Sequence, residues 1–195
     1  MIKKGISALI AGALLLALVG CGESAAAATE EQRQRALAAG FDADLVYVLE
    51  VDGYNAAAGG SGVYGADGYQ TIYVSESGDD LRLTVERATL DDITCPALPV
   101  PGAEGVDITV ECTRDDDGWR RVAGDREEYA VLRDDLLVRV SGTRAGANLM
   151  REAALEARPA TSKELDDVLP PDSEIVERGD ISGDNAPNND VGAGG

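Results

Sequence analysis

The sequence predicts an α+β fold: a mainly antiparallel sheet of about seven strands, with a short N-terminal helix before it and helical segments after it. Between residues 71 and 141, short stretches of alternating apolar and polar residues are separated by turns rich in Asp and Gly, as in antiparallel hairpins. Capping-box motifs stand on either side of these strands, at residues 29–32 and 161–164. A chain of 195 residues has room for one ordinary domain, which we place at residues 30–169.

The first expected element is a short helix. Thr29 is followed three residues later by Gln32, a spacing that caps a helix N-terminus, and acidic residues occupy the first turn. Gly40 follows the expected helix end. Residues 45–51 are mostly apolar and rich in strand-forming side chains, so they predict a strand buried on both faces.

A run of Gly and Ala with interspersed Tyr, at residues 52–70, predicts a loop or a wide hairpin tip. Tyr54, Tyr64 and Tyr69 stand among glycines, a composition that binding surfaces use because rigid aromatic area loses little side-chain entropy. Residues 60–65 also match the pattern G-x-G-x-x-G, but a dinucleotide site needs a helix after the third Gly, and a strand is expected here. The three tyrosines therefore mark a candidate binding loop.

Alternation predicts the later strands. The first two should form a half-buried hairpin with Leu81, Leu83 and Val85 on its apolar side. Three prolines make residues 88–105 irregular, and Cys112 shares the apolar side of the strand that follows. The expected strands lie at residues 71–75, 81–86, 106–112, 119–122, 129–133 and 136–141.

Two helical segments are expected after the strands. Thr143 can cap a helix that runs to about residue 157, before Pro159. Thr161 begins a second, short helix that buries Leu165, Val168 and Leu169. Residues 170–195 hold six acids, one Arg and repeated Gly, Pro and Asn, so we expect a disordered acidic tail.

Acidic turns are the only weak candidates for metal binding. Asp115, Asp116 and Asp117 precede a Gly in an expected hairpin turn, but they lack the ligand spacing of a calcium loop. If the strands form a simple meander, this turn lies at the same end of the sheet as the turns at residues 79–80 and 134–135. Such a rim could bind divalent cations weakly or simply keep the surface soluble. We expect no cofactor.

Composition excludes several classes of function. Lys and Arg number 17 against 36 Asp and Glu, a formal charge of -19, so nucleic-acid phosphates would be repelled. The chain has no His, which rules out Ser-His-Asp and Cys-His catalysis and His-bearing zinc sites within it. Paired carboxylates of the kind found in glycoside hydrolases stay open, although no pair stands out.

The N-terminal residues read as a targeting segment. Lys3 and Lys4 precede an apolar stretch at residues 6–19, which is shorter than the roughly 20 residues of a comfortable bilayer crossing. The segment Leu18-Val19-Gly20-Cys21 resembles the lipobox of bacterial lipoproteins. That resemblance implies removal of residues 1–20 as a signal peptide, a diacylglycerol on Cys21 and a tether at residues 21–29. The alternatives are a plain secretory signal and, with less support, a retained transmembrane helix.

The resemblance places the protein on the outer side of the cell membrane, where the remaining cysteines meet an oxidising environment. Cys95 and Cys112 are then an even pair, and they lack the C-x-x-C spacing of redox motifs. We therefore expect a disulfide that encloses 16 residues. Without Lys3 and Lys4 the mature chain has 15 basic residues and a formal charge of -21, so it should be held off an anionic membrane surface.

Residues 1–170 resemble small lipoproteins of actinobacteria that carry no assigned activity, in the lipobox and in the stretch at residues 157–166. The resemblance implies location more than chemistry. We expect a lipid-anchored, non-catalytic binding module for a protein, a cell-wall component or a small ligand. The alternatives are a carboxylate-dependent hydrolase of the envelope and a structural spacer without a ligand.

Overall fold

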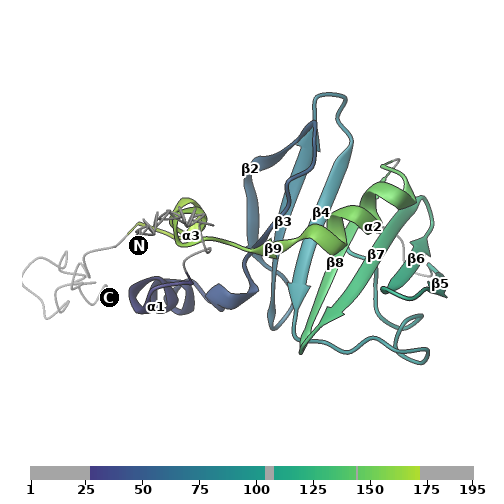
Figure 1. The fold of residues 1–195 in the computed structure, drawn as a ribbon, viewed down its shortest axis with the longest axis horizontal. Helices are drawn as coiled ribbons and strands as arrows, with labels where there is room; N and C mark the ends of the chain where they lie inside the picture. Colours follow the sequence, from purple (N-terminus) through teal and green to yellow (C-terminus); the bar gives the residue numbers. More distant parts are fainter. Residues whose placement is uncertain (1–26, 104–107, 144, 172–195) are drawn as a thin grey trace, which may run out of the picture.

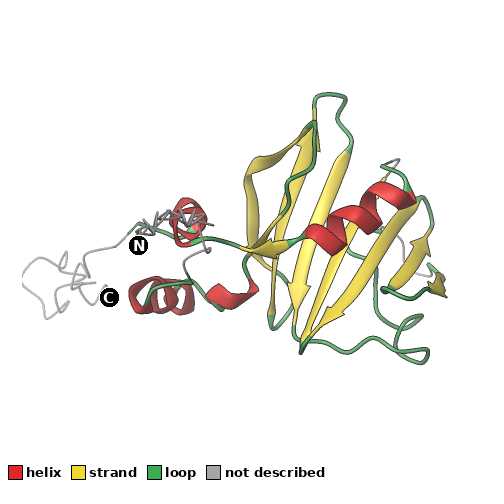
Figure 2. Cartoon of the chain, viewed as in Figure 1, coloured by secondary structure: helices red, strands yellow, loops and turns green. Residues whose placement is uncertain are grey.

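The computed structural model describes residues 27–103, 108–143 and 145–171, and it confirms the α+β fold with a seven-stranded antiparallel sheet (Figures 1 and 2). The spatial order of the strands differs from their order in the chain. Across the sheet they are β2 (Tyr54–Val63), β3 (Gly68–Ser75), β4 (Asp80–Glu86), β8 (Leu136–Thr143), β7 (Arg126–Arg133), β6 (Trp119–Ala123) and β5 (Val110–Arg114).

The simple meander is wrong, because the chain does not place β5 beside β4. After β4, residues 87–103 run over one face of the sheet, β5 lies at its far edge, and β5 to β8 then return strand by strand until β8 pairs with β4. The crossing reverses the strand directions relative to a meander. The turns at residues 115–118 and 134–135 therefore lie at one end of the sheet, while Asp79 and Asp80 lie at the other. The expected rim of seven carboxylates does not form.

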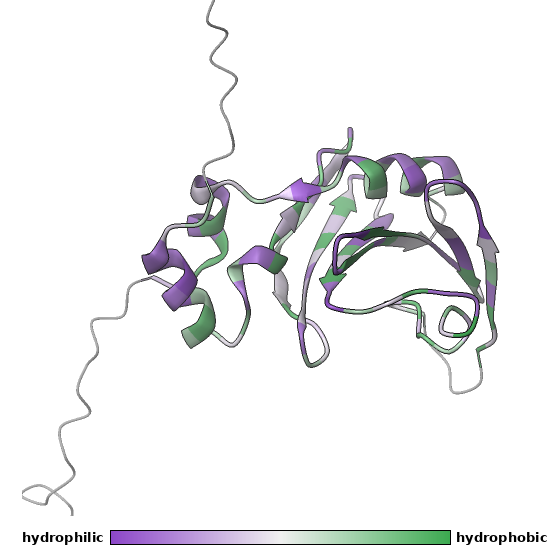
Figure 3. Cartoon of the chain, turned by 60° about the horizontal axis from the view of Figure 1, so that its bottom comes forward, coloured by the Kyte–Doolittle hydropathy of each residue, from purple (hydrophilic) through white to green (hydrophobic). Residues whose placement is uncertain are grey.

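One face of the sheet, the helix face, is apolar. The expected alternation holds on β4, where Leu81, Leu83 and Val85 all point to this face and are buried. Helix α2 (Ala147–Glu156) packs over β7 and β8 and buries Met150 against them. Figure 3 shows α2 on this face and the crossing segment, residues 87–103, on the opposite one, the loop face.

Helix α2 begins later than expected. Thr143 is the last residue of β8, and its hydroxyl accepts a hydrogen bond from Arg126 at 3.3 Å instead of capping the helix. The N-cap is Gly146, whose φ of 86° favours glycine because side chains are strained there. Thr143 pairs with Arg126 of β7 and so belongs to the strand, which prevents it from capping the helix.

The remaining elements form a small layer beside β3 and β4 (Figure 1). They are α1 (Glu30–Ala38), the 3₁₀ turn η1 (Ala43–Leu45), β1 (Tyr47–Val48), β9 (Arg158–Pro159) and α3 (Ser162–Val168). Both capping boxes are confirmed, at Thr29 and Thr161. Gln32 joins the two helices, since its side-chain amide donates to the carbonyl oxygen of Ser162 at 2.7 Å.

Two further expectations from the sequence need correction. Residues 45–51 contribute only the two-residue strand β1, which pairs with β9 outside the main sheet. The apolar side chains of Leu45 and Val46, which predicted a longer strand, are buried in the core from a 3₁₀ turn and its end. Residues 52–70 are not a loop: most of them form β2, which pairs with β3 at the sheet edge. A bulge between Ala56 and Ser61 accommodates the residues, glycines among them, by which β2 exceeds the paired stretch of β3.

Candidate functional site

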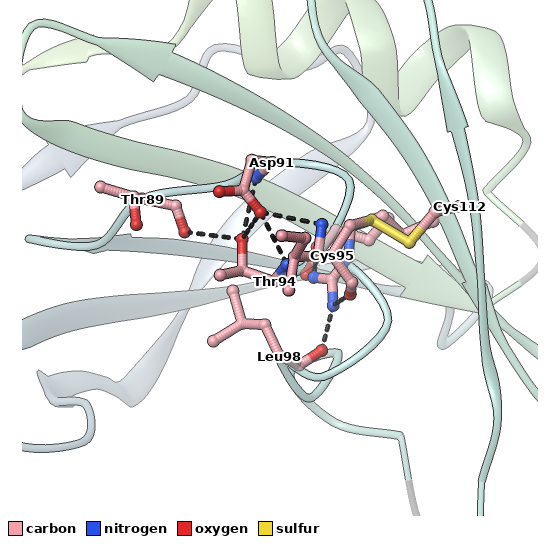
Figure 4. The surroundings of a disulfide bond; sticks show 9 residues. Thr89, Asp91, Thr94, Cys95, Leu98 and Cys112 are labelled. Carbon is pink, nitrogen blue, oxygen red and sulfur yellow. Dashed lines mark hydrogen bonds and ion pairs between the residues drawn. A yellow bond between two sulfur atoms is a disulfide. The ribbon is translucent and has the colours of Figure 1, made fainter.

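The crossing segment on the loop face is organised by a tight turn and a disulfide (Figure 4). The Asp91 carboxylate accepts hydrogen bonds from the backbone N–H groups of Ile93 and Thr94, at 2.9 and 2.7 Å, and from the Thr94 hydroxyl at 3.0 Å. These bonds lower the pKa of Asp91, those to Thr94 most. The turn presents Cys95 to Cys112 on β5, and the expected disulfide is confirmed, with the two Cα atoms 6.3 Å apart.

Arginines of the sheet bind the crossing segment through its backbone carbonyls. Arg121 donates to the carbonyl oxygens of Leu98 and, at 3.1 Å, Cys95, while Arg139 donates to that of Pro99 at 3.0 Å. The prolines of this segment have no N–H, so it offers acceptors without matching donors. Guanidinium groups supply the donors that a buried irregular backbone lacks.

The same arginines belong to a buried charge row formed by Arg121, Glu128, Arg139 and Glu86, which runs across β6, β7, β8 and β4. Arg121 pairs with Glu128, Arg139 pairs with Glu86, and Arg139 Nη1 lies 3.7 Å from Glu128 Oε2. Burial raises the pKa of Glu128, and the two neighbouring arginines oppose that rise. Removing one member of a buried ion pair typically costs about 3–5 kcal/mol of stability, so the row holds the loop face together.

Polar atoms without hydrogen bonds concentrate on this face. Among the described residues, seven buried side-chain nitrogen or oxygen atoms have no hydrogen-bond partner, and all seven project from β4, β6, β7 or β8 toward the loop face. Some of them still take part in the ion pairs of the charge row. The residues that carry them are Arg82, Thr84, Glu86, Arg121, Glu128 and Arg139. We take the loop face around Arg82 and Arg139 as the candidate site.

The three tyrosines of the expected binding loop are separated by the structure. Tyr64, after β2, places its ring 5.5 Å from the guanidinium carbon of Arg139, so it borders the candidate site. Tyr69 points to the opposite face, where it is buried and its ring centroid lies 4.7 Å from that of Phe41. Tyr54 is half-buried at the start of β2. They do not form one binding surface.

The acidic turn at residues 115–117 is occupied by contacts within the protein. Asp115 accepts a hydrogen bond from the Tyr129 hydroxyl at 2.5 Å, and Arg151 of α2 pairs with both Asp115 and Asp117. The Tyr129 bond lowers the pKa of Asp115, while burial and Asp115 together raise the pKa of Tyr129 to about 12. These carboxylates fasten α2 to the β5–β6 turn. In the described ranges, no group of three His, Cys, Asp or Glu residues could hold a metal ion.

An open pocket of about 270 Å³ lies on the other side of the molecule, between residues 50–52 and α2. Its charged lining is entirely acidic: Glu50, Asp52, Glu152 and Glu156. Arg158, outside the lining, pairs with Glu50 at 2.5 Å. The pocket is therefore a negatively charged hollow without a cationic partner group in its wall.

Sequence reasoning missed the charge row because it predicts a half-buried hairpin, in which the side opposite Leu81, Leu83 and Val85 is left uncovered. Arg82, Thr84 and Glu86 lie on that opposite side. Alternation identifies two faces of a strand but does not say what covers each. One signal was present: the four strands each carry an Arg or a Glu next to apolar residues, at Arg82, Arg121, Glu128 and Arg139, and the chain offers a proline-rich segment able to cover them.

Cys21 and the expected signal peptide lie outside the described residues, as does almost all of the expected acidic tail. Within the described part of the chain, no helix has the length and apolar character needed to cross a membrane. No family model, curated protein or solved structure matches this chain.

Proposed function

We propose that the chain is a lipid-anchored extracytoplasmic protein that binds an extended segment of a partner protein along β2. The lipobox-like segment ending at Cys21 supports the anchor. The disulfide supports an oxidising environment outside the cytoplasm, because such bonds seldom persist inside it.

The contrast between the two sheet edges carries the binding part of the proposal. β5 is short, bears Glu111 and Arg114, and is fastened by the disulfide at Cys112. Charged residues and short length are the usual protection of an edge strand against pairing. β2 has ten residues and none is charged, in a chain where 27% of residues are. In the described structure it pairs with β3 alone, so its outer backbone groups can accept an added strand on either side of the bulge.

Catalysis has less support. Within the candidate site, the two carboxylates of the charge row, Glu86 and Glu128, are ion-paired with arginines. A glycoside hydrolase needs one carboxyl to act as acid and a second to act as base or nucleophile across a substrate. Carboxylates held by guanidinium groups are suited to fixing structure, so we favour binding.

Cross-linking in membranes tests the binding edge. Cys95 and Cys112 are bonded to each other, so Val63→Cys adds one thiol for a photoreactive maleimide once Cys21 is acylated. Leu132→Cys is the matched control, since Leu132 and Val63 are both 46% exposed but Leu132 lies on an interior strand. We expect a discrete protein adduct from the probe at position 63 and none from the probe at position 132. Identical adducts from both positions, or none from position 63, would contradict the proposal.

A further inference from the structure

Arg82 differs from the other arginines of the described residues in having no strong partner. Its only hydrogen bond joins Nη1 to the Gln70 side-chain oxygen at a long 3.4 Å, and its Nε is buried without a partner. Arg114 lies over the Trp119 ring, and Arg133 donates to carbonyl oxygens at the end of α2. The others form ion pairs: Arg33, Arg35, Arg87, Arg120, Arg121, Arg126, Arg139, Arg151 and Arg158.

The acids nearest to Arg82 on its own strand are already engaged. Asp80, Arg82 and Glu86 all point to the loop face of β4. Arg126 pairs with Asp80, and Arg139 pairs with Glu86. Although the chain has 36 acidic residues, Arg82, which lies between Asp80 and Glu86, forms no ion pair with a carboxylate among the described residues.

Thr84 supplies a second, independent observation. It follows Arg82 on the same face of β4 and is 0% exposed, and its hydroxyl has no hydrogen-bond partner within the part of the chain that the structure describes. Gln70 lies directly opposite on β3. The buried oxygens of Glu86 and Glu128 that lack a hydrogen bond are each ion-paired with Arg139. The buried polar atoms left without any partner are therefore mainly N–H donors and the Thr84 hydroxyl. An excess of donors fits a ligand that brings only acceptor oxygens.

The surface beside Arg82 is open to such a ligand. Arg82, Gln70 and Ile72 are partly exposed on the loop face. On β2 the residue opposite Gln70 is Gly62, and a Cβ added there would meet no atom within 4 Å. No side chain of β2 therefore covers Gln70 from this position.

We propose that Arg82, Thr84 and Gln70 form a binding site for an oxyanion, the carboxylate or phosphate group of a ligand. The guanidinium of Arg82 supplies the charge, and the Thr84 hydroxyl and the Gln70 amide supply hydrogen bonds. The site is independent of the β2 edge, since it uses side chains on one face of the sheet and not the backbone of its border.

Calorimetric titration of the full-length lipoprotein in an uncharged, phosphate-free detergent tests the site. The probes are inorganic phosphate and the dicarboxylate glutarate, each at constant ionic strength. We expect saturable binding of at least one probe; phosphate alone indicates a phosphate-bearing ligand, and glutarate alone a carboxylate-bearing one. Arg82→Gln should weaken binding at least about tenfold, in line with the loss of a charged hydrogen bond. Arg114→Gln, which removes an exposed arginine of β5, should leave it unchanged.

Gly62→Phe gives an independent check, because it fills the open space above Gln70 and leaves Arg82 in place. It should also abolish binding if the site lies there. Failure of both probes to saturate in the parent protein overturns the proposal, as does equal binding by the parent and the folded Arg82→Gln protein. Neither result depends on the cross-linking at position 63, so the two proposals fail separately.

Discussion

Glu164 shows how one side chain serves several local needs. Its carboxylate accepts hydrogen bonds from the backbone N–H and the hydroxyl of Thr161, at 2.7 and 2.8 Å, and so closes the capping box of α3. Arg158 donates to both of its oxygens at 2.9 Å. Hydrogen bonding from Arg158, more than any other contact, lowers the pKa of Glu164 from 4.5 to about 2. The carboxylate is therefore held in its charged form.

This pKa predicts how stability depends on pH. Because the folded state lowers the pKa, the contribution of Glu164 is complete above about pH 4.5 and is lost as the pH falls toward 2. The side chain is 33% exposed, so we expect Glu164→Gln to cost only about 1 kcal/mol at neutral pH. Thermal unfolding of both proteins from pH 2 to 7 measures the difference, which should shrink in acid. A difference that stays constant over this range would contradict the assignment.

At the scale of elements, the crossing segment, residues 87–103, depends on covalent and polar contacts more than on apolar burial. Its apolar contacts are small clusters around Trp119 and around Val100, whereas the main core lies on the helix face. The disulfide and the arginine bonds to carbonyl oxygens take the place of a strand ladder. This explains why a segment with three prolines stays ordered against the sheet.

Removing the disulfide should therefore lower the free energy of unfolding. The double variant Cys95→Ala, Cys112→Ala opens a loop of 16 residues, for which chain entropy predicts a loss of roughly 3 kcal/mol. Urea unfolding followed by the fluorescence of Trp119 measures it, because that ring packs in the same cluster as Cys95. Reduced parent protein should match the double variant. Equal stability of the oxidised parent and the variant would show that the other contacts suffice.

At the scale of the whole molecule, charge is distributed unevenly. The arginines of the charge row and Arg126 lie on the loop face, where they form ion pairs. Other parts of the surface are rich in acidic residues, including the hollow between residues 50–52 and α2. A formal charge of -19 opposes close approach to anionic lipid, so the proposed membrane location requires an anchor. Two acyl chains on Cys21 would supply that anchor, whereas one chain binds only marginally.

The proposed anchor predicts the behaviour of one variant. Cys21→Ala should abolish labelling with a radioactive fatty acid and leave an uncleaved precursor, because the thiol is the group that is acylated. Labelling and mass spectrometry of the N-terminal peptide measure both effects, with Cys95→Ala, Cys112→Ala as the control that keeps Cys21. Continued acylation of the Cys21→Ala protein, or a mature parent protein that begins elsewhere without lipid, would refute the anchor.

Local patterns in the chain were enough to predict the fold class, both capping boxes, most strand positions and the pairing of Cys95 with Cys112. Each of these depends on residues close in sequence or on the two cysteines that remain when the lipobox-like segment accounts for Cys21. The partner of β4, the strand identity of β2 and the burial of the charge row depend on contacts between residues far apart in the chain. Alternation in a strand marks two faces, but only the path of residues 87–103 decided that the polar face of β4 would be covered as well. The candidate site around Arg82 therefore emerged only from the tertiary structure.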